Sequence, residues 1–189
     1  MEYNAVDAEL VAETLSGNRE AFSRLYDRHA RMVRAVVAGV SGDWTAVDDM
    51  TQDSFLRAYR NLPKLRDAQR FGPWIVGIAR QVGRERRRTL RRDRHEFRDP
   101  QPWEVESTAN VVANVADRDD LAFVMRKLNE FEERQRVAVH AFFIEQQDKR
   151  LAAESLGLSR SGFYALVRRA IARLAAQIER GDATERVKR

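Results

Sequence analysis

The chain has 189 residues, enough for one domain or two small ones, and 43% of them are hydrophobic, which suffices for real cores. Its net charge of +5 favours a polyanionic partner. The absence of cysteine excludes disulfides, thiolate metal sites and cysteine nucleophiles. Only four prolines and nine glycines, among many Ala, Leu, Arg and Glu residues, favour an all-α protein.

Neither a membrane span nor an export signal is visible. The longest apolar run, residues 35–40, is far too short to cross a bilayer. Residues 1–4 lack the basic start and apolar core of a signal peptide. We therefore expect a cytoplasmic protein without membrane insertion.

Two helices are predicted before residue 42. A short amphipathic helix is expected over about 7–15, and Asn18 is a good N-cap for a second helix that ends near Gly39. His29 lies on or beside the apolar stripe of that helix and is interpreted as a packing residue rather than a ligand. The stripe recurs at three- and four-residue steps and consists of Ala21, Phe22, Leu25, Tyr26, His29, Met32, Val33, Val36 and Val37.

Residues 47–59 form the next predicted helix, with Thr45 as its N-cap. Its broad apolar side consists of Val47, Met50, Ser54, Phe55, Ala58, Tyr59 and Leu62. Its opposite side carries Asp49, Gln52, Asp53 and Arg60, with Leu56 among them. An acidic face with a central leucine is typical of a docking surface, where charges orient the partner and leucine supplies apolar area. A stray exposed leucine explains the pattern equally well.

A strongly basic helix follows a connection over 64–72, with Pro73 near its start. Arginines at a helix end complement the dipole, but that explains only two or three of them. A one-sided row of this density favours phosphate contact, which the planar guanidinium makes bidentately. The row begins with Arg80, Gln81, Arg84, Arg87 and Arg88 and continues through Arg91, Arg92 and Arg94.

The periodicity ends in a polar, acidic stretch that contains Asp99-Pro100-Gln101-Pro102. We interpret residues 96–117 as a flexible linker between a first domain, 1–95, and a second, 118–180, with a tail over 181–189. Trp103 is the one large apolar residue in the first half of this linker and is a candidate for docking on a partner or on either domain.

The second domain is predicted to be helical, with Asp148 capping a short helix and Ser159 capping the last one after a turn at Gly157. This order of a short helix, a turn containing glycine and a longer helix matches the helix-turn-helix pattern, whose second helix enters the DNA major groove. An ordinary helical hairpin remains the alternative. The outer face of the last helix includes Arg160, Ser161, Tyr164, Ala165, Arg168 and Arg169.

Together the two halves resemble bacterial sigma factors of the sigma-70 family, specifically the extracytoplasmic function (ECF) group. Residues 22–26, 48–59 and 71–80 resemble its region two, and residues 133–137 and 156–159 resemble its region four. The order of these motifs is more specific than any one of them. The linker in place of an intermediate region indicates the ECF group.

The resemblance implies a fold of two small helical domains, a region-two bundle and a region-four helix-turn-helix. Asp49, Gln52, Asp53 and Leu56 would bind the β′ coiled coil of core RNA polymerase. Residues 62–71 and the helix bearing Arg80, Gln81, Arg84 and Arg88 would read and open the promoter −10 element, and the helix from Arg160 would read the −35 element. No cofactor or metal is implied. Phe142 and Phe143 would either contact the polymerase β flap or, as we favour, belong to the core.

Two departures from the family pattern leave promoter preference open. Where the family usually has Asn and, four residues later, Asp, this chain has Gln81 and Glu85. In the last helix, residues 161–166 lack two basic side chains that the family often carries. Tyr164 and Ala165 would then contact thymine methyl groups or sugars, and Arg160, Arg168 and Arg169 would carry the phosphate contacts.

Two other classes of function fit the sequence less well. A helix-turn-helix regulator acting without polymerase leaves the face of Asp49, Gln52, Asp53 and Leu56 unexplained. A metal-dependent nuclease would use Asp48, Asp49 and Asp53, yet no further acidic cluster or histidine partner accompanies them. As a further hypothesis, the two domains close on each other or on an anti-sigma protein that masks both binding faces.

Overall fold

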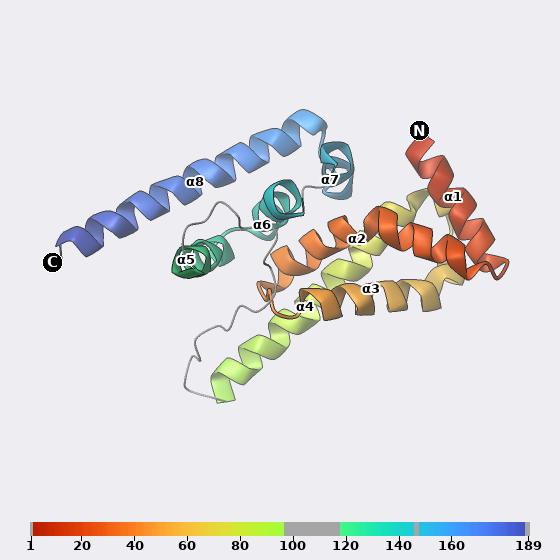
Figure 1. The fold of residues 1–189 in the computed structure, drawn as a ribbon, viewed down its shortest axis with the longest axis horizontal. Coiled ribbons are helices and arrows are strands. Elements are labelled where there is room, and N and C mark those ends of the chain that lie inside the picture. Colours follow the sequence, from red (N-terminus) through yellow and green to blue (C-terminus); the bar gives the residue numbers. More distant parts are fainter. Residues whose placement is uncertain (1, 97–117, 146–147, 188–189) are drawn as a thin grey trace.

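A computed structural model describes residues 2–96, 118–145 and 148–187, and these form helices joined by short turns (Figure 1). The first half contains α1 (Glu2–Leu15), α2 (Arg19–Ser41), α3 (Val47–Asn61) and α4 (Phe71–Glu96), with short 3₁₀ turns η1 (Leu62–Lys64) and η2 (Ala68–Arg70). The second half contains α5 (Arg118–Asn129), α6 (Glu133–Val139), the π-helical turn η3 (His140–Ile144), α7 (Lys149–Ser155) and α8 (Arg160–Val187).

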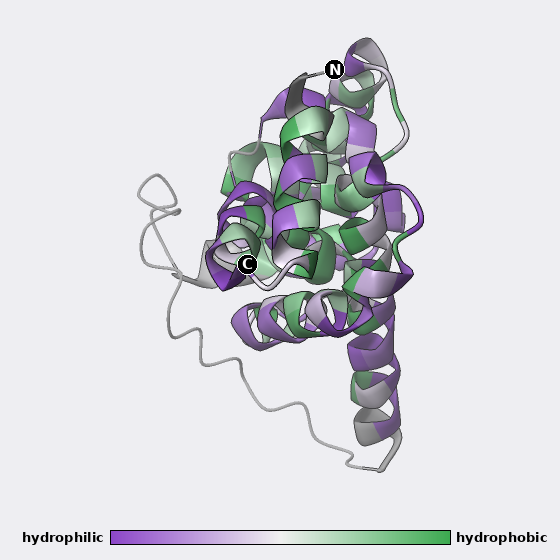
Figure 2. Cartoon of the chain, turned by 90° about the vertical axis from the view of Figure 1, so that its right-hand side faces the viewer, coloured by the Kyte–Doolittle hydropathy of each residue, from purple (hydrophilic) through white to green (hydrophobic). Residues whose placement is uncertain are grey.

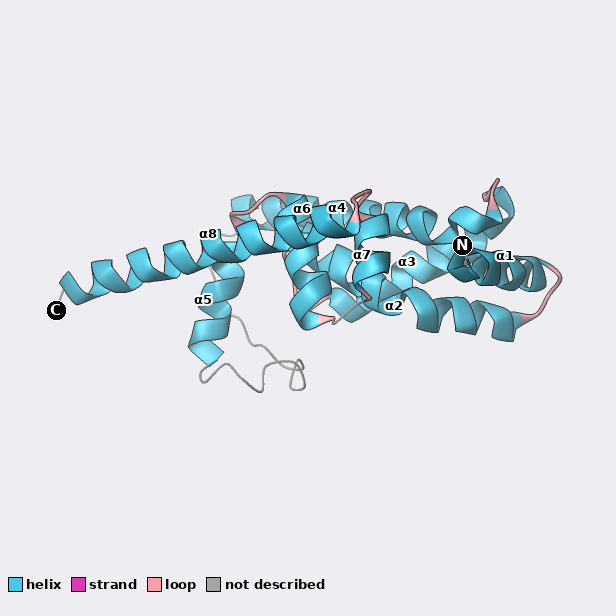
Figure 3. Ribbon diagram, turned by 90° about the horizontal axis from the view of Figure 1, so that it is seen from above, coloured by secondary structure: helices cyan, strands magenta, loops and turns pink. Residues whose placement is uncertain are grey.

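The described residues contain no strand (Figure 3), and the all-α prediction is confirmed. In these same residues, no helix is both long and apolar enough to cross a membrane. Apart from residue 96, which ends α4, the predicted linker and its Trp103 lie outside the described residues. The helix α8 continues through residue 187, well into the stretch predicted to be a tail.

Three predicted helix caps are confirmed. The side chain of Asn18 accepts hydrogen bonds from the backbone N–H groups of residues 20 and 21 at the start of α2. Asp148 does the same at the start of α7, and Ser159 accepts from the Gly162 N–H at 3.1 Å in the first turn of α8. These side chains satisfy backbone donors that the first turn of a helix leaves unpaired.

The predicted cap at Thr45 is wrong. The N-cap position of α3 is Ala46, which makes no side-chain capping bond. Thr45 instead donates its hydroxyl to Asp43 Oδ1 at 2.7 Å, and its backbone N–H donates to the same oxygen at 3.1 Å. The Thr45 hydroxyl thus donates to the carboxylate of Asp43 instead of accepting from the first N–H groups of α3, and the turn before the helix closes around Asp43.

The helix α2 lies at the centre of the molecule and packs against α1, α3 and α4 and also against α6 and η3 of the second half (Figure 1). Apolar residues line the contacts between helices, whereas the far end of α4 is strongly hydrophilic (Figure 2). One continuous buried cluster contains Val36 and Phe71 of the first half together with Val137 and Phe163 of the second. The two halves therefore share a core in this structure, while the division at 95 and 118 stays a prediction.

The halves approach each other tightly where Gly39 of α2 meets Val137 of α6. A Cβ atom at Gly39 would lie 2.7 Å from the Val137 nitrogen, closer than real side chains come to backbone. Beside this contact, buried Arg136 donates to the carbonyls of Gly39, Val40 and Phe131. Burial lowers its pKa to about 10. The carbonyl end of α2 carries the negative end of the helix dipole, which stabilises a cation there.

A second contact between the halves is made by two rings. Trp44, in the turn before α3, lies against His140 of η3 with 4.1 Å between ring centroids. His140 is buried, and its Nδ1 has no hydrogen-bond partner among the described residues. Burial, with a smaller contribution from the charge of Arg136, lowers the pKa of His140 to about 3. The imidazole is therefore neutral in the folded protein at neutral pH.

Two glycine substitutions test the tight approach of α2 and α6. In Gly39→Ala the new methyl group meets the backbone of Val137, so the free energy of unfolding should fall by about 1–3 kcal/mol. In the matched control Gly77→Ala, on an exposed part of α4, nothing lies within 4 Å of the new methyl group. The free energy of unfolding of this control should rise by up to about 1 kcal/mol, because alanine has a higher helix propensity than glycine. Urea unfolding measures both changes, and equal effects would contradict the assigned contact.

The buried His140 predicts a loss of stability in mild acid. Below its ordinary pKa of 6.5 the unfolded chain binds a proton that the folded chain refuses until about pH 3. Between about pH 7.5 and about pH 5.5 the free energy of unfolding should fall by about 1.4 kcal/mol more in wild type than in His140→Leu. Urea titrations at the two pH values measure this difference. Because the other two histidines are common to both proteins, an identical pH dependence would contradict the assignment.

Candidate functional site

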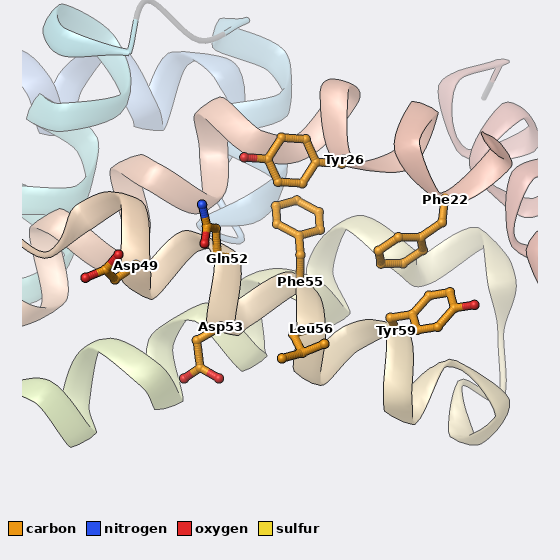
Figure 4. A pocket seen from close by; sticks show the side chains of 8 residues that line it. All are labelled: Phe22, Tyr26, Asp49, Gln52, Asp53, Phe55, Leu56 and Tyr59. Carbon is orange, nitrogen blue, oxygen red and sulfur yellow. The ribbon is translucent and has the colours of Figure 1, made fainter. Parts of the chain in front are cut away.

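The outer side of α3 carries the predicted docking residues. Leu56 is 47% exposed, Asp49 and Gln52 are exposed, and Asp53 is half-exposed. The structure brings all four to one groove of about 570 Å³. Figure 4 shows that the rest of its wall is aromatic and comes from α2 and α3, namely from Phe22, Tyr26, Phe55 and Tyr59.

The aromatic wall is a packed cluster that spans the two helices. The ring centroids of Tyr26 and Phe55 are 4.5 Å apart, and those of Phe22 and Tyr59 are 4.9 Å apart. Such contacts fix ring positions and add to the burial energy. The apolar periodicity of α2 and α3 placed these residues on buried stripes, yet Tyr26 and Tyr59 are exposed at the groove edge. Periodicity alone does not separate the edge of a stripe from its centre.

Two polar residues on the inner side of α3 explain how this face stays buried. The hydroxyl of Thr51 donates to the carbonyl of Val47, and that of Ser54 donates to the carbonyl of Met50, both at 2.7 Å. Both side chains are buried, and these bonds within the helix satisfy their donors. The inner side therefore packs without an unpaired hydroxyl, and the charged side turns outward.

The basic face predicted on α4 is only partly open in this structure. Gln81, Arg84 and Arg88 are exposed, whereas Arg80 and Arg87 are half-buried. Burial, with repulsion from neighbouring Arg91, lowers the pKa of Arg87. At the start of α6, Glu133 lies within 3.3 Å of Arg84 and 3.6 Å of Arg80. A carboxylate of the second half thus pairs with two of the arginines predicted to bind DNA.

A pocket of about 430 Å³ lies in the connection between α3 and α4, where the resemblance implied promoter reading. Asp67 shapes it by accepting a hydrogen bond from the Gln69 N–H at 3.0 Å. Trp74 on the pocket wall lies two turns before Gln81, which places the two on the same side of α4. The wall consists of Lys64, Leu65, Arg66, Asp67, Arg70, Pro73 and Trp74.

The turn between α7 and α8 has helix-turn-helix character. Gly157 takes a left-handed φ of +64°, and Arg134 of α6 donates to the carbonyl of Leu156 at 2.7 Å. This anchors the turn on α6 and directs the first turns of α8 outward. Most of the predicted residues on that face are exposed, namely Arg160, Ser161, Tyr164, Arg168 and Arg169, while Ala165 is half-buried.

The preferred interpretation of Phe143 as a core residue is wrong. Its side chain is 47% exposed, and its ring lies 4.7 Å from that of half-buried Phe142. Phe142 also contacts Phe163 and Tyr164, so the start of α8 is fixed against an aromatic surface of η3. The π-helical turn adds a residue to the helical repeat. Phe143 lies within this turn, with its side chain outward.

Two of the three acidic residues considered as metal ligands are paired with arginines. Asp48 pairs with Arg34, and Asp53 pairs with Arg57. Among the residues whose side chains the structure describes, no group of three or more His, Asp or Glu is placed to hold a metal ion.

The chain is similar to known proteins over nearly its whole length. Residues 25–93 match the family model of sigma-70 region 2. The RNA polymerase sigma factor NccH of Alcaligenes xylosoxydans xylosoxydans is 28% identical, over 93% of this chain and 96% of its own. The ECF RNA polymerase sigma factor SigM of Mycobacterium tuberculosis is 29% identical, over 89% of this chain and 83% of its own.

A solved structure shows the same fold. CnrH, in complex with the cytosolic domain of CnrY, superposes with a TM-score of 0.59 at 25% identity, covering 92% of this chain and 97% of that one. The match includes both halves of the chain and not only the segment recognised by the family model.

Proposed function

The chain belongs to the ECF group of the sigma-70 family and directs transcription initiation, and from that premise we propose how its exposed faces divide this work. The outer side of α3 binds core RNA polymerase. The α3–α4 pocket and the basic face of α4 bind the −10 element, and the first turns of α8 bind the −35 element. A regulator that never recruits polymerase is not favoured, because the relatives are RNA polymerase sigma factors.

The polymerase contact rests on one observation, an exposed leucine in an acidic and aromatic groove. Leu56 supplies apolar area that nothing in this chain covers among the described residues, and Asp49 and Asp53 flank it on the same helix. An apolar residue surrounded by charges suits a partner helix of complementary charge, with the β′ coiled coil as the occupant.

The DNA contacts rest on the distribution of arginines. Arg84 and Arg88 on α4, and Arg160, Arg168 and Arg169 on α8, are exposed and come from two helices that belong to different halves. Two separate basic helices suit a bipartite promoter, because each binds its own segment of phosphate backbone. When DNA binds, phosphates then replace Glu133 in its ion pairs with Arg80 and Arg84.

We further propose an inhibitory protein partner of the anti-sigma kind. CnrH was solved in complex with the cytosolic domain of CnrY, so a similar chain binds a second protein. On this chain the groove along α2 and α3 is the exposed apolar surface that such a partner would cover.

Substitution of Leu56 tests the polymerase contact. Leu56→Ala should weaken binding to core RNA polymerase by about 5- to 30-fold, because truncating a leucine in an interface costs about 1–2 kcal/mol of binding free energy. Its exposure predicts a change in unfolding free energy within about 0.5 kcal/mol. The matched control is Leu15→Ala on α1, where the leucine is 52% exposed and outside the groove. Fluorescence titration against core polymerase measures both, and equal affinities of the two variants would contradict the assigned face.

Glu133 tests the DNA contact of α4. Glu133→Gln removes the carboxylate that pairs with Arg80 and Arg84. Affinity for promoter DNA should therefore rise by about two- to fivefold, which corresponds to the free energy that exposed ion pairs contribute. Glu130→Gln makes the same charge change at an exposed residue that pairs with Lys127 instead. Anisotropy titrations at two salt concentrations compare the variants. An equal gain in both would show a general charge effect and contradict competition for these arginines.

A further inference from the structure

Gln81 and Glu85 lie one turn apart on the outer side of α4, and Arg57 of α3 holds the second of them. Gln81 Nε2 donates to Glu85 Oε1 at 3.0 Å. Arg57 Nη2 lies 2.8 Å from Glu85 Oε2, so each oxygen of this carboxylate faces a donor. Arg57 is fixed in turn by Asp53, with 3.0 Å from Nε to Oδ1 and 2.9 Å from Nη2 to Oδ2. A bidentate arginine thus links α3 to the side chain that contacts Gln81.

The charge of Glu85 decides which end of the Gln81 amide faces it. The hydrogen bond from Arg57, opposed in part by burial, lowers the pKa of Glu85, so the carboxylate is ionised at neutral pH. An ionised carboxylate accepts hydrogen bonds and donates none. Only the NH₂ end of Gln81 can therefore face Glu85. The carbonyl oxygen of the exposed Gln81 amide is left for a ligand outside the protein.

We propose that Glu85 is a positioning residue that turns Gln81 into a hydrogen-bond acceptor toward promoter DNA and thereby selects adenine or cytosine at one position of the −10 element. This inference rests on the proposed contact of α4 with that element. Adenine and cytosine present an exocyclic amino donor where guanine and thymine present a carbonyl oxygen, which an acceptor repels. Arg84 and Arg88, exposed on either side of Glu85, anchor the neighbouring phosphates.

The test is run-off transcription with core RNA polymerase on a promoter library randomised over the −10 element, with transcripts sequenced. Wild type should favour A or C over G or T at one position by about fivefold, the effect of one hydrogen bond. Gln81→Ala should lose that preference alone. Glu85→Gln should weaken it, because an amide faces Gln81 in either orientation. Glu85→Lys offers only donors, so it should turn the Gln81 amide and shift the preference at the same position to G or T.

The control Glu9→Lys makes the same charge change on an exposed part of α1 and should keep the wild-type preference. Thermal unfolding verifies that each variant is folded, and base preference at one position is a readout that a purely structural role does not move. An unchanged preference in Glu85→Lys, or an equal loss of transcripts from every promoter, overturns the inference. So does Gln81→Ala with every preference intact. If wild type directs no transcript from any promoter, the proposed function itself fails, and this inference fails with it.

Discussion

Burial of the C-terminal half of α2 is the constraint on which the rest of the structure depends. Residues 35–41 are buried one after another and not in a stripe, because helices of both halves surround them. Such a helix end needs partners for its carbonyls, and Arg136 supplies them from α6. Removing water from this end makes the contact costly to break, since both the guanidinium and the carbonyls would lose their bonds. The packing around α2 thereby fixes α3 and α4 with their charged sides outward.

Those two outward faces differ in chemistry but are not independent. The face of α3 is acidic around an exposed leucine, and the face of α4 is basic. Arg57 lies between them and bonds to Asp53 on one side and Glu85 on the other. Each pair alone is partly exposed and weak. Together they hold three side chains in one arrangement, so the groove and the proposed promoter-reading residue share a common anchor.

The sequence predicted most of what is local. Helix positions, the caps at Asn18, Asp148 and Ser159, and the exposure of Leu56 followed from periodicity and capping chemistry. Errors arose where a neighbour competed. Thr45 bonds to Asp43 rather than capping α3, and Phe143 is exposed within a π-helical turn instead of lying in the core. The pairing of Glu133 with Arg84 joins residues 49 positions apart, which no local pattern encodes.

The contact between the halves combines two kinds of interaction that respond differently to bound DNA. The ion pairs of Glu133 with Arg80 and Arg84 are long and partly exposed, so DNA phosphates displace the carboxylate at little cost. The apolar approach of Val137 to Gly39 and the buried bonds of Arg136 contain no group that DNA can replace. In the proposed function, exchange of the arginine partners therefore does not require the halves to separate. Separation requires a partner that covers the apolar faces of α2 and α6, and this role falls to protein rather than to nucleic acid.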